Sequence, residues 1–398
     1  MKIIILKWNA YGLTDVINAF KKLGHEVYEA EFNKENFRTD PEFENRLENM
    51  ISDIGPDFVF SLNYFPVTAL VCKKMGTKYI SWIYDNPYVL LYSYTVIFPT
   101  NYIFVFDTTQ YNEFRSNGIN TIYYMPLCSD AERLGGYDDF AYFKTTKWYN
   151  HADIAFVGSL YTEDHQFYNR LKNISEYTRG YLEGLMEAQS HVYGYNFIES
   201  SLPKEIIREM QKELPLYPNE DGVESEEWLF AQYVINRRIS GIERTEMLKL
   251  IGTKYKYDLY TKNEELQLPN CCNHGQIESY EGAPYVYKTA RINLNFTLKS
   301  IISGIPLRVF EIIGSGGFLL SNYQADFDDC FVAGEDYVYF ESPGDMMDKI
   351  EYFLSHEKER AEIAQNGYNK ALKEHTYEKR LKKIIDTVFN NAQSGVSE

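Results

Sequence analysis

The sequence predicts an α/β protein made of two doubly wound domains, each a parallel sheet covered by helices on both faces. Three observations predict this fold class. The chain has 398 residues, more than one hydrophobic core usually organises. Short apolar runs alternate with stretches of helical spacing, which is typical of parallel βαβ units. A charged helical stretch interrupts the alternation, which then resumes, and this indicates a second domain that carries an insertion.

The N-terminal domain is predicted over residues 1–145. It begins with the strand KIIILKW at 2–8, because this run is short and mostly apolar. An amphipathic helix follows at 14–24 and ends at a glycine, and a strand at 25–32 completes the first βαβ unit. Further strands are expected at 57–62, 78–83, 101–106 and 120–125.

The segment YVLLYSYTVIFPTNYIFVF at 88–106 carries no charged residue and is long enough to span a membrane. The break at residues 99–101, PTN, divides it, and its second half is β-branched and aromatic. We therefore expect a helix packed on a sheet and then a buried strand, and no integral membrane segment.

A second Rossmann-like domain is predicted over 150–375, after a polar, glycine-containing linker at 129–151. A helical insertion is expected at about 164–250, as a possible surface for a partner protein. Residues 376–398 are predicted to form a helix that crosses back to the first domain and a frayed end. Strands of the second domain are expected at 152–160, 255–261, 290–296, 316–321 and 336–342.

The stretch SGIPLRVFEIIGSGGFLLSN at 303–322 contains an apolar helix with one polar stripe, and Pro306 is placed in its first turn. A strand, a turn with Gly304 and a helix N-terminus together form an anion site at the rim of a sheet. Arg308 in the first turn adds a cation, and Glu311 can accept hydrogen bonds from ribose hydroxyls. An intrahelical surface pair of Arg308 and Glu311 is the alternative. Diphosphate and ribose together indicate a nucleotide sugar.

Three glycines after this helix have a different purpose. Gly314, Gly316 and Gly317 are expected to end it in left-handed geometry and to let the next strand enter the sheet without a side-chain clash. They do not form a dinucleotide-binding fingerprint, because that motif follows a strand and opens a helix.

Residues from Ile292 to about Lys383 resemble the C-terminal half of the CgeB-like (spore maturation protein) glycosyltransferases, with a group 1 type C-terminal domain of the GT-B superfamily. The resemblance rests on ARINLNF, SGIPLRVFEIIGSGGFLLSNY, FVAGEDYVYFES, FLSHEKERAEIAQNG and HTYEKR. SWIYDNP at 81–87 and the block at 105–130 resemble the domain that accompanies them. The resemblance implies two Rossmann-like domains facing a cleft, with the sugar nucleotide on the C-terminal domain and the acceptor on the N-terminal side.

The resemblance also assigns residues. Glu311 stands where retaining GT-B enzymes carry the second glutamate of an E-x7-E pattern, but Ser303 replaces the first, so retaining or inverting stereochemistry stays open. Asp85 follows a strand and is the candidate general base of an inverting transfer, with an ordinary turn as the alternative. The expected donor-binding set, besides Arg308, consists of Glu311, Ser303, Gly304, Gly158, Ser159, Asn295, His274, Asn9 and Gly12.

Metal binding is not expected. Cys271, Cys272 and His274 lie close together in the sequence, but adjacent cysteines do not readily chelate one tetrahedral ion and no fourth ligand has suitable spacing. No cofactor is expected beyond a nucleotide-sugar co-substrate, for which a UDP-sugar is the first candidate.

Charge and cysteine content limit the partners and the compartment. The formal net charge of −17 repels nucleic acid and anionic lipid surfaces. The five cysteines form no C-x-x-C pair, and the N-terminus has the character of a first strand and not of a signal peptide. These features favour free thiols in a cytoplasmic protein.

The sequence therefore predicts a metal-independent glycosyltransferase. It would move a sugar from a nucleotide-diphosphate donor to a hydroxyl of an unknown acceptor on a protein, a glycan or a cell-surface polymer. A sugar-nucleotide epimerase of the same fold and a non-catalytic nucleotide- or sugar-binding scaffold are the alternatives.

Overall fold

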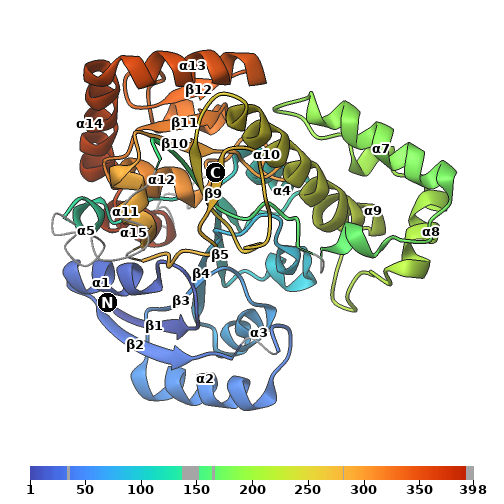
Figure 1. The fold of residues 1–398 in the computed structure, drawn as a ribbon. Helices are drawn as coiled ribbons and strands as arrows, with labels where there is room; N and C mark the ends of the chain where they lie inside the picture. The colour runs from blue at the N-terminus through green and yellow to red at the C-terminus, as the bar shows by residue number, and fades with distance from the viewer. Residues whose placement is uncertain (34–35, 137–151, 164–165, 281, 391–398) are drawn as a thin grey trace. The chain divides into compact units, whose positions relative to one another are not determined.

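The computed structural model describes residues 1–33, 36–136, 152–163, 166–280 and 282–390. The chain divides into two compact units (Figure 1). The first comprises Met1–Cys128, Pro218–Glu224 and His375–Glu398, and the second comprises Ser129–Tyr217 and Ser225–Glu374. Most of the expected linker, residues 137–151, lies outside the described part of the chain, as does the expected boundary between 145 and 150.

The first unit contains a six-stranded, fully parallel sheet in the order β2-β1-β3-β4-β5-β6. Its inner strands are largely apolar because the sheet is covered on both faces, as the side chains of Ile3 to Leu6 in β1 illustrate with 0% exposure. The strands are β1 (Lys2–Lys7), β2 (Glu26–Glu31), β3 (Phe58–Leu62), β4 (Lys78–Trp82), β5 (Asn101–Val105) and β6 (Ile122–Tyr124).

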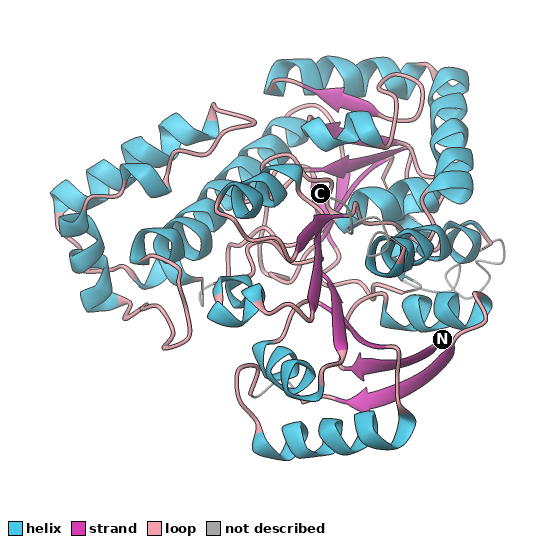
Figure 2. Cartoon of the chain, turned by 180° about the vertical axis from the view of Figure 1, so that it is seen from behind, coloured by secondary structure: helices cyan, strands magenta, loops and turns pink. Residues whose placement is uncertain are grey.

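The helices of the first unit connect these strands or pack on them (Figure 2). The C-terminal helix α15 packs on α1, and a ring contact joins Tyr377 of α15 to Trp82 at the end of β4. These helices are α1 (Leu13–Lys22), α2 (Pro41–Ile54), α3 (Pro66–Met75), α4 (Thr108–Ser116) and α15 (Tyr377–Phe389).

The uncharged segment 88–106 differs from the expected helix and strand. Its first half forms two short 3₁₀ helices, η1 (Val89–Tyr92) and η2 (Tyr94–Ile97), and its second half forms β5 as expected. Ser93 between them has an extended backbone, and its hydroxyl accepts from the Thr95 N–H and caps the second 3₁₀ helix. Among the described helices, none is both long and apolar enough to cross a membrane.

The second unit contains another six-stranded parallel sheet, in the order β12-β11-β10-β7-β8-β9. The sequence did not predict β9, because this three-residue edge strand carries no apolar run. The strands are β7 (Ile154–Val157), β8 (Tyr257–Tyr260), β9 (Cys271–Asn273), β10 (Ile292–Asn295), β11 (Leu319–Asn322) and β12 (Val338–Phe340).

Helices cover the second sheet on both faces, with α13 and α14 beside β11 and β12 in Figure 1. A further short helix, α5, precedes β7 in the chain and contacts α12 and α14. The helices of this sheet are α5 (Ala131–Gly135), α11 (Gly282–Thr289), α12 (Leu307–Gly314), α13 (Pro343–Ser355) and α14 (Glu357–Glu374).

The segment between β7 and β8 is helical, as its charged, amphipathic sequence predicts (Figure 1). It has a small apolar core of its own, which includes Leu182, Met210 and Phe230. Its helices are η3 (Phe167–Arg170), α7 (Glu176–Ser190), η4 (Glu199–Ser201), α8 (Lys204–Glu213), α9 (Glu226–Leu229), the π-helical turn η5 (Phe230–Ile235) and α10 (Asn236–Gly252).

The helix α12 differs by one position from the expected one, because Pro306 is its N-cap residue and not part of its first turn. Its end agrees with the prediction in part: of the three glycines only Gly316 is left-handed, and Gly314 is the last helical residue. Gly316 has a φ of 78°, and its N–H and that of Gly317 donate to carbonyls of the last turn. A Cβ on Gly317 would lie 2.8 Å from Asn293 Nδ2, so this glycine lets the chain enter the sheet.

Candidate functional site

The second sheet changes its strand order between β7 and β10, which are neighbours although they are far apart in the sequence. Chain connections leave such a point in opposite directions, and the loops at the carboxyl ends of the two strands therefore diverge and leave room for a ligand. Two stretches expected to bind donor meet here: Gly158 and Ser159 follow β7, and Asn295 ends β10.

Arg308 lies at this point, in the first turn of α12. Its Nη1 donates to Asn295 Oδ1 at 3.3 Å, and its guanidinium lies over the Phe156 ring of β7 with its Cζ 5.4 Å from the ring centroid. Asn295 is fully buried and its amide nitrogen donates to the hydroxyls of Thr297 and Ser321. The arginine is therefore held half-buried at the sheet edge.

Gly158 is required by this arrangement. Its φ is 155°, a conformation that side chains rarely adopt. A Cβ at this position would lie 2.8 Å from Arg308 Cζ and overlap the guanidinium. The absence of a side chain thus lets Arg308 rest against the backbone of the loop that follows β7.

A second arginine, Arg244 of α10, donates hydrogen bonds to the loops that follow β7 and β10. Its Nη1 donates to Ser159 O at 2.6 Å, and its Nε and Nη2 donate to Phe296 O at 3.1 and 2.6 Å. Arg244 is only 4% exposed, and this burial lowers its pKa to about 10. The positive charge of Arg308 lowers the pKa further, whereas Tyr161 raises it. Two cations thus lie near one loop, and an anion bound there would relieve their repulsion.

Arg244 was not predicted from the sequence, because it lies in the helical insertion, far from the segments that resemble the family. One signal was available: Gly241 interrupts an otherwise helical pattern, and such a glycine often marks a close approach. In the structure a Cβ on Gly241 would lie 2.8 Å from Leu160 O, so this glycine lets α10 pass against the β7 loop.

Tyr287 of α11 connects Arg308 with Glu311. Burial raises the pKa of the Tyr287 hydroxyl well above its ordinary value, nearby Glu311 raises it further, and a hydrogen bond with Arg308 opposes the rise. The phenol therefore stays neutral and Arg308 and Glu311 share one polar environment. Both are half-buried, as expected of a polar stripe on an otherwise apolar helix.

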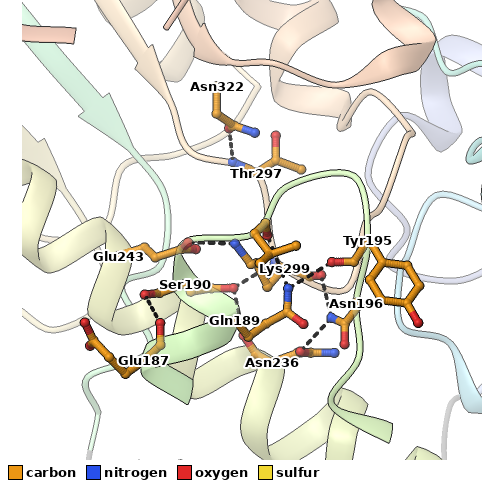
Figure 3. Close-up of polar contacts among 12 residues, drawn as sticks. Glu187, Gln189, Ser190, Tyr195, Asn196, Asn236, Glu243, Thr297, Lys299 and Asn322 are labelled. Atoms are coloured by element: carbon orange, nitrogen blue, oxygen red, sulfur yellow. Dashed lines mark hydrogen bonds and ion pairs between the residues drawn. The ribbon is translucent and has the colours of Figure 1, made fainter. Parts of the chain in front are cut away.

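The loop between β10 and α12 is fixed by polar contacts with the insertion (Figure 3). Lys299 Nζ forms a 2.8 Å ion pair with Glu243 of α10, and the Lys299 carbonyl accepts from Asn196 at 3.2 Å. Thr297 N–H donates to Asn322 Oδ1 at 2.7 Å. Since the Lys299 ammonium is paired and only 7% of its side chain is exposed, we assign it to positioning this loop.

The turn before α12 is also fastened. Ser303 is 5% exposed and its carbonyl accepts from Asp326 N–H at 3.0 Å, while the carbonyl of Gly304 accepts from Gln324 Nε2 at 3.3 Å. The structure thus gathers Gly158, Ser159, Asn295, Ser303, Gly304, Arg308 and Glu311 around the start of α12 and the ends of β7 and β10.

Three predicted residues belong to the first unit and lie at the carboxyl edge of its sheet. Asp85 is exposed, and its Oδ2 accepts from Asn63 Nδ2 at 2.7 Å, which fixes the carboxylate. Asn9 is exposed after β1. Gly12 caps α1 with a φ of 76°, and a Cβ there would overlap the Tyr377 hydroxyl. Packing alone accounts for Gly12, and donor contacts of these residues stay predictions.

His274, which follows β9, is fixed by other groups of the second unit. Its Nε2 lies 2.8 Å from Asp258 Oδ1, its ring stacks on Tyr260 at 4.7 Å, and 9% of its side chain is exposed. Contact with a nucleobase also stays a prediction for this residue.

Residues 232–386 match the sequence profile of a family described as "Glycosyl transferase-like". The match begins just before α10 and therefore includes both Arg244 and Arg308. No curated protein matches the chain in sequence.

Solved structures resemble the whole chain. A glycosyltransferase from Rickettsia africae aligns with a TM-score of 0.53 and 11% identity over 99% of both chains. HepE of Anabaena in complex with UDP and glucose aligns with a TM-score of 0.53 and 8% identity over 98% of this chain and 100% of its own. Sucrose-phosphate synthase from Thermosynechococcus elongatus gives 0.53 and 9% over 99% of both chains. At such identities the likeness establishes the fold, which is GT-B.

Proposed function

We propose that the chain is a glycosyltransferase whose second unit binds a nucleotide-diphosphate sugar at the start of α12. The observation that carries the proposal is the position of Arg308, held by Asn295 and Phe156 over the glycine of the β7 loop with Arg244 nearby. A fixed guanidinium beside a helix N-terminus is a site for a diphosphate. The glycosyl transferase-like match over residues 232–386 supports the same activity.

In this proposal Arg308 performs the main electrostatic work of the reaction. Negative charge grows on the diphosphate as its bond to the anomeric carbon breaks, and a preorganised cation stabilises that charge without moving. The positive end of the α12 helix dipole adds to the stabilisation. Arg244 positions the loops and adds positive potential, and Glu311 accepts hydrogen bonds from the ribose.

The acceptor hydroxyl must lose a proton as it attacks the sugar. Asp85, whose carboxylate is oriented by Asn63, is proposed as the base that takes it. This assignment suits an inverting transfer. The retaining enzymes with the E-x7-E pattern have a glutamate where this chain has Ser303, which agrees with an inverting mechanism. We also propose that the chain belongs to the CgeB-like subtype.

A UDP-sugar is the first donor to test. HepE, which shares the fold, has been solved in complex with UDP and glucose and with UDP-glucose. No metal is assigned to the transfer step, because Arg308 and α12 can neutralise the diphosphate. Omitting Mg²⁺ and Mn²⁺ is therefore expected to leave the rate of transfer unchanged.

The test measures UDP affinity by calorimetry in wild type, Arg308→Ala and a matched control. Removing a charged hydrogen bond costs about 1.5–3 kcal/mol, so Arg308→Ala is expected to weaken binding about 10- to 150-fold. Arg208→Ala removes the same charge from the exposed surface of α8 and is expected to leave affinity unchanged. Equal affinities in all three proteins, with intact circular dichroism, would contradict the proposed site.

Incubation with UDP-, GDP- and dTDP-sugars then separates the activities. Release of nucleoside diphosphate supports transfer or slow hydrolysis. An isomerised donor would instead identify an epimerase, and saturable binding without any product would identify a scaffold.

A further inference from the structure

The second sheet carries another cluster of polar side chains, at its outer edge and away from the carboxyl ends of β7 and β10. Asp258 of β8 lies directly opposite Cys272 of β9, and His274 follows two residues later. Since side chains two apart in a strand share a face, all three side chains lie on the same face of the sheet. The carboxylate oxygen, the sulfur and the ring nitrogen lie within 4.8 Å of one another.

We propose that Asp258, Cys272 and His274 bind one divalent cation of the zinc class, with a water molecule as the fourth ligand. A carboxylate, a thiolate and an imidazole are the ligand types that Zn²⁺ prefers. Carboxylate and thiolate together also neutralise its charge. No metal was expected from the sequence, because only Cys271, Cys272 and His274 lie close together in it. The register of β8 against β9 adds Asp258 to Cys272 and His274.

The required geometry is within reach of small side-chain movements. Ligand bonds of about 2.0–2.3 Å in a tetrahedron place neighbouring ligand atoms about 3.3–3.8 Å apart. Asp258 Oδ1 and His274 Nε2 are 2.8 Å apart and must separate slightly, and Cys272 must approach them from at most 4.8 Å. Cys272 is exposed, so its side chain can rotate.

The groups around the cluster hold two of the ligands in place. Asp258 is 2% exposed and its second oxygen, Oδ2, accepts from Ala152 N–H at 2.6 Å, which leaves Oδ1 directed at the imidazole. The Tyr260 ring stacks on His274, and the His274 backbone N–H donates to Leu259 O at 2.8 Å. Such contacts orient ligands in metal sites.

Solvent and metal have an entry path. A cavity of about 680 Å³ is lined by Asp258 and Cys272 and by residues at the amino ends of β7, β8 and β9. This cavity lies at the amino ends of the strands, whereas Arg308 lies near the carboxyl ends of β7 and β10. The proposed cation is therefore separate from the transfer step. By joining β8 to β9 it would add a bond to a three-residue strand at the edge of the sheet.

The same residues could instead suggest a nucleophilic cysteine activated by an Asp–His pair. Burial and the neighbouring Asp258 carboxylate both raise the pKa of the Cys272 thiol. A catalytic cysteine requires the opposite shift, so this shift argues against a nucleophile.

The test titrates Co²⁺, as a coloured substitute for Zn²⁺, into the chelator-treated full-length protein. The expected result is saturation at one equivalent, with a thiolate-to-cobalt charge-transfer band and visible bands typical of tetrahedral cobalt, both abolished by Zn²⁺. Binding should release the thiol proton, so affinity should rise with pH. Zn²⁺ should also raise the melting temperature.

Matched variants identify the ligands. Cys272→Ser is expected to lose the charge-transfer band, whereas Cys271→Ser should keep it, because Cys271 lies on the opposite face against the apolar core. Asp258→Asn and His274→Gln should each weaken Co²⁺ binding at least tenfold. The proposal is overturned if folded wild type shows no saturable band, or if Cys271→Ser and Cys272→Ser behave alike.

Discussion

At the scale of single residues, Gly158 determines how closely Arg308 can approach β7. Two properties of this glycine matter, its φ of 155° and the space that a Cβ would take from the guanidinium. Gly158→Ala is therefore expected to destabilise the protein by about 1–3 kcal/mol and to weaken UDP binding as Arg308 is displaced. Urea unfolding and calorimetry measure the two effects.

A double-mutant cycle separates the two causes. In an Arg308→Ala background the overlap disappears and only the backbone strain remains, so Gly158→Ala should cost less there. Gly180→Ala is the control, because this helical glycine of α7 has open space around its Cβ position and the change should be neutral or stabilising. Equal costs in both backgrounds would argue against contact between Arg308 and Gly158.

Sequence reasoning found some of these residues and missed others for a physical reason. Arg308 and Gly158 lie at recognisable places, the first turn of a helix and the end of a strand. Arg244 and Asp258 do not, because their roles arise only when α10 packs on the β7 loop and when β8 pairs with β9. Such tertiary contacts leave almost no local pattern.

At the scale of elements, a side chain of α8 accepts hydrogen bonds from the start of α7. Glu209 accepts hydrogen bonds from the Thr178 hydroxyl and from the backbone and hydroxyl of Ser175, the N-cap residue of α7. These bonds lower the pKa of Glu209 from its ordinary 4.5, and the bond from Thr178 has the largest effect. The carboxylate form therefore stabilises the insertion.

This predicts a pH-dependent difference between wild type and Glu209→Gln. Because the pKa of Glu209 is lowered in the folded protein, its contribution to folding stability is complete above the ordinary pKa of 4.5. This contribution is lost as the pH falls through the lower pKa of the folded state. Wild type should melt at a higher temperature than Glu209→Gln at neutral pH, and the gap should close in acid. Glu205→Gln, on the exposed side of α8, is the control. A gap that is constant with pH would contradict this role.

The strands show which elements a sequence reveals. Buried parallel strands such as β1 and β5 are largely apolar, so their positions were predicted to within a few residues. The edge strand β9 reads Cys-Cys-Asn and has no such run. The 3₁₀ helices at 89–97 were taken for one helix because the Ser93 cap that separates them depends on local hydrogen bonding.

At the scale of the whole molecule, the C-terminal helix α15 belongs to the first unit. Leu381 on this helix has 0% exposure, so Leu381→Ala should cost about 2–5 kcal/mol. Hydrogen exchange should show lost protection in peptides from Met1–Cys128 and little change in those from Ser225–Glu374. Leu372→Ala on α14 is the control, since Leu372 is 40% exposed. Loss of protection confined to the second unit would refute this assignment.

The path of the chain, which returns to the first unit at Pro218–Glu224 and again at His375, has a consequence for biosynthesis. Translation delivers the first sheet early, yet the helix that completes its packing is synthesised only after the whole second unit. Until then the nascent polypeptide exposes the apolar surface that α15 will bury, while the second unit already has all its segments. Chaperone demand should therefore persist until α15 has been made, and the unit whose synthesis begins first should be the unit that finishes folding last.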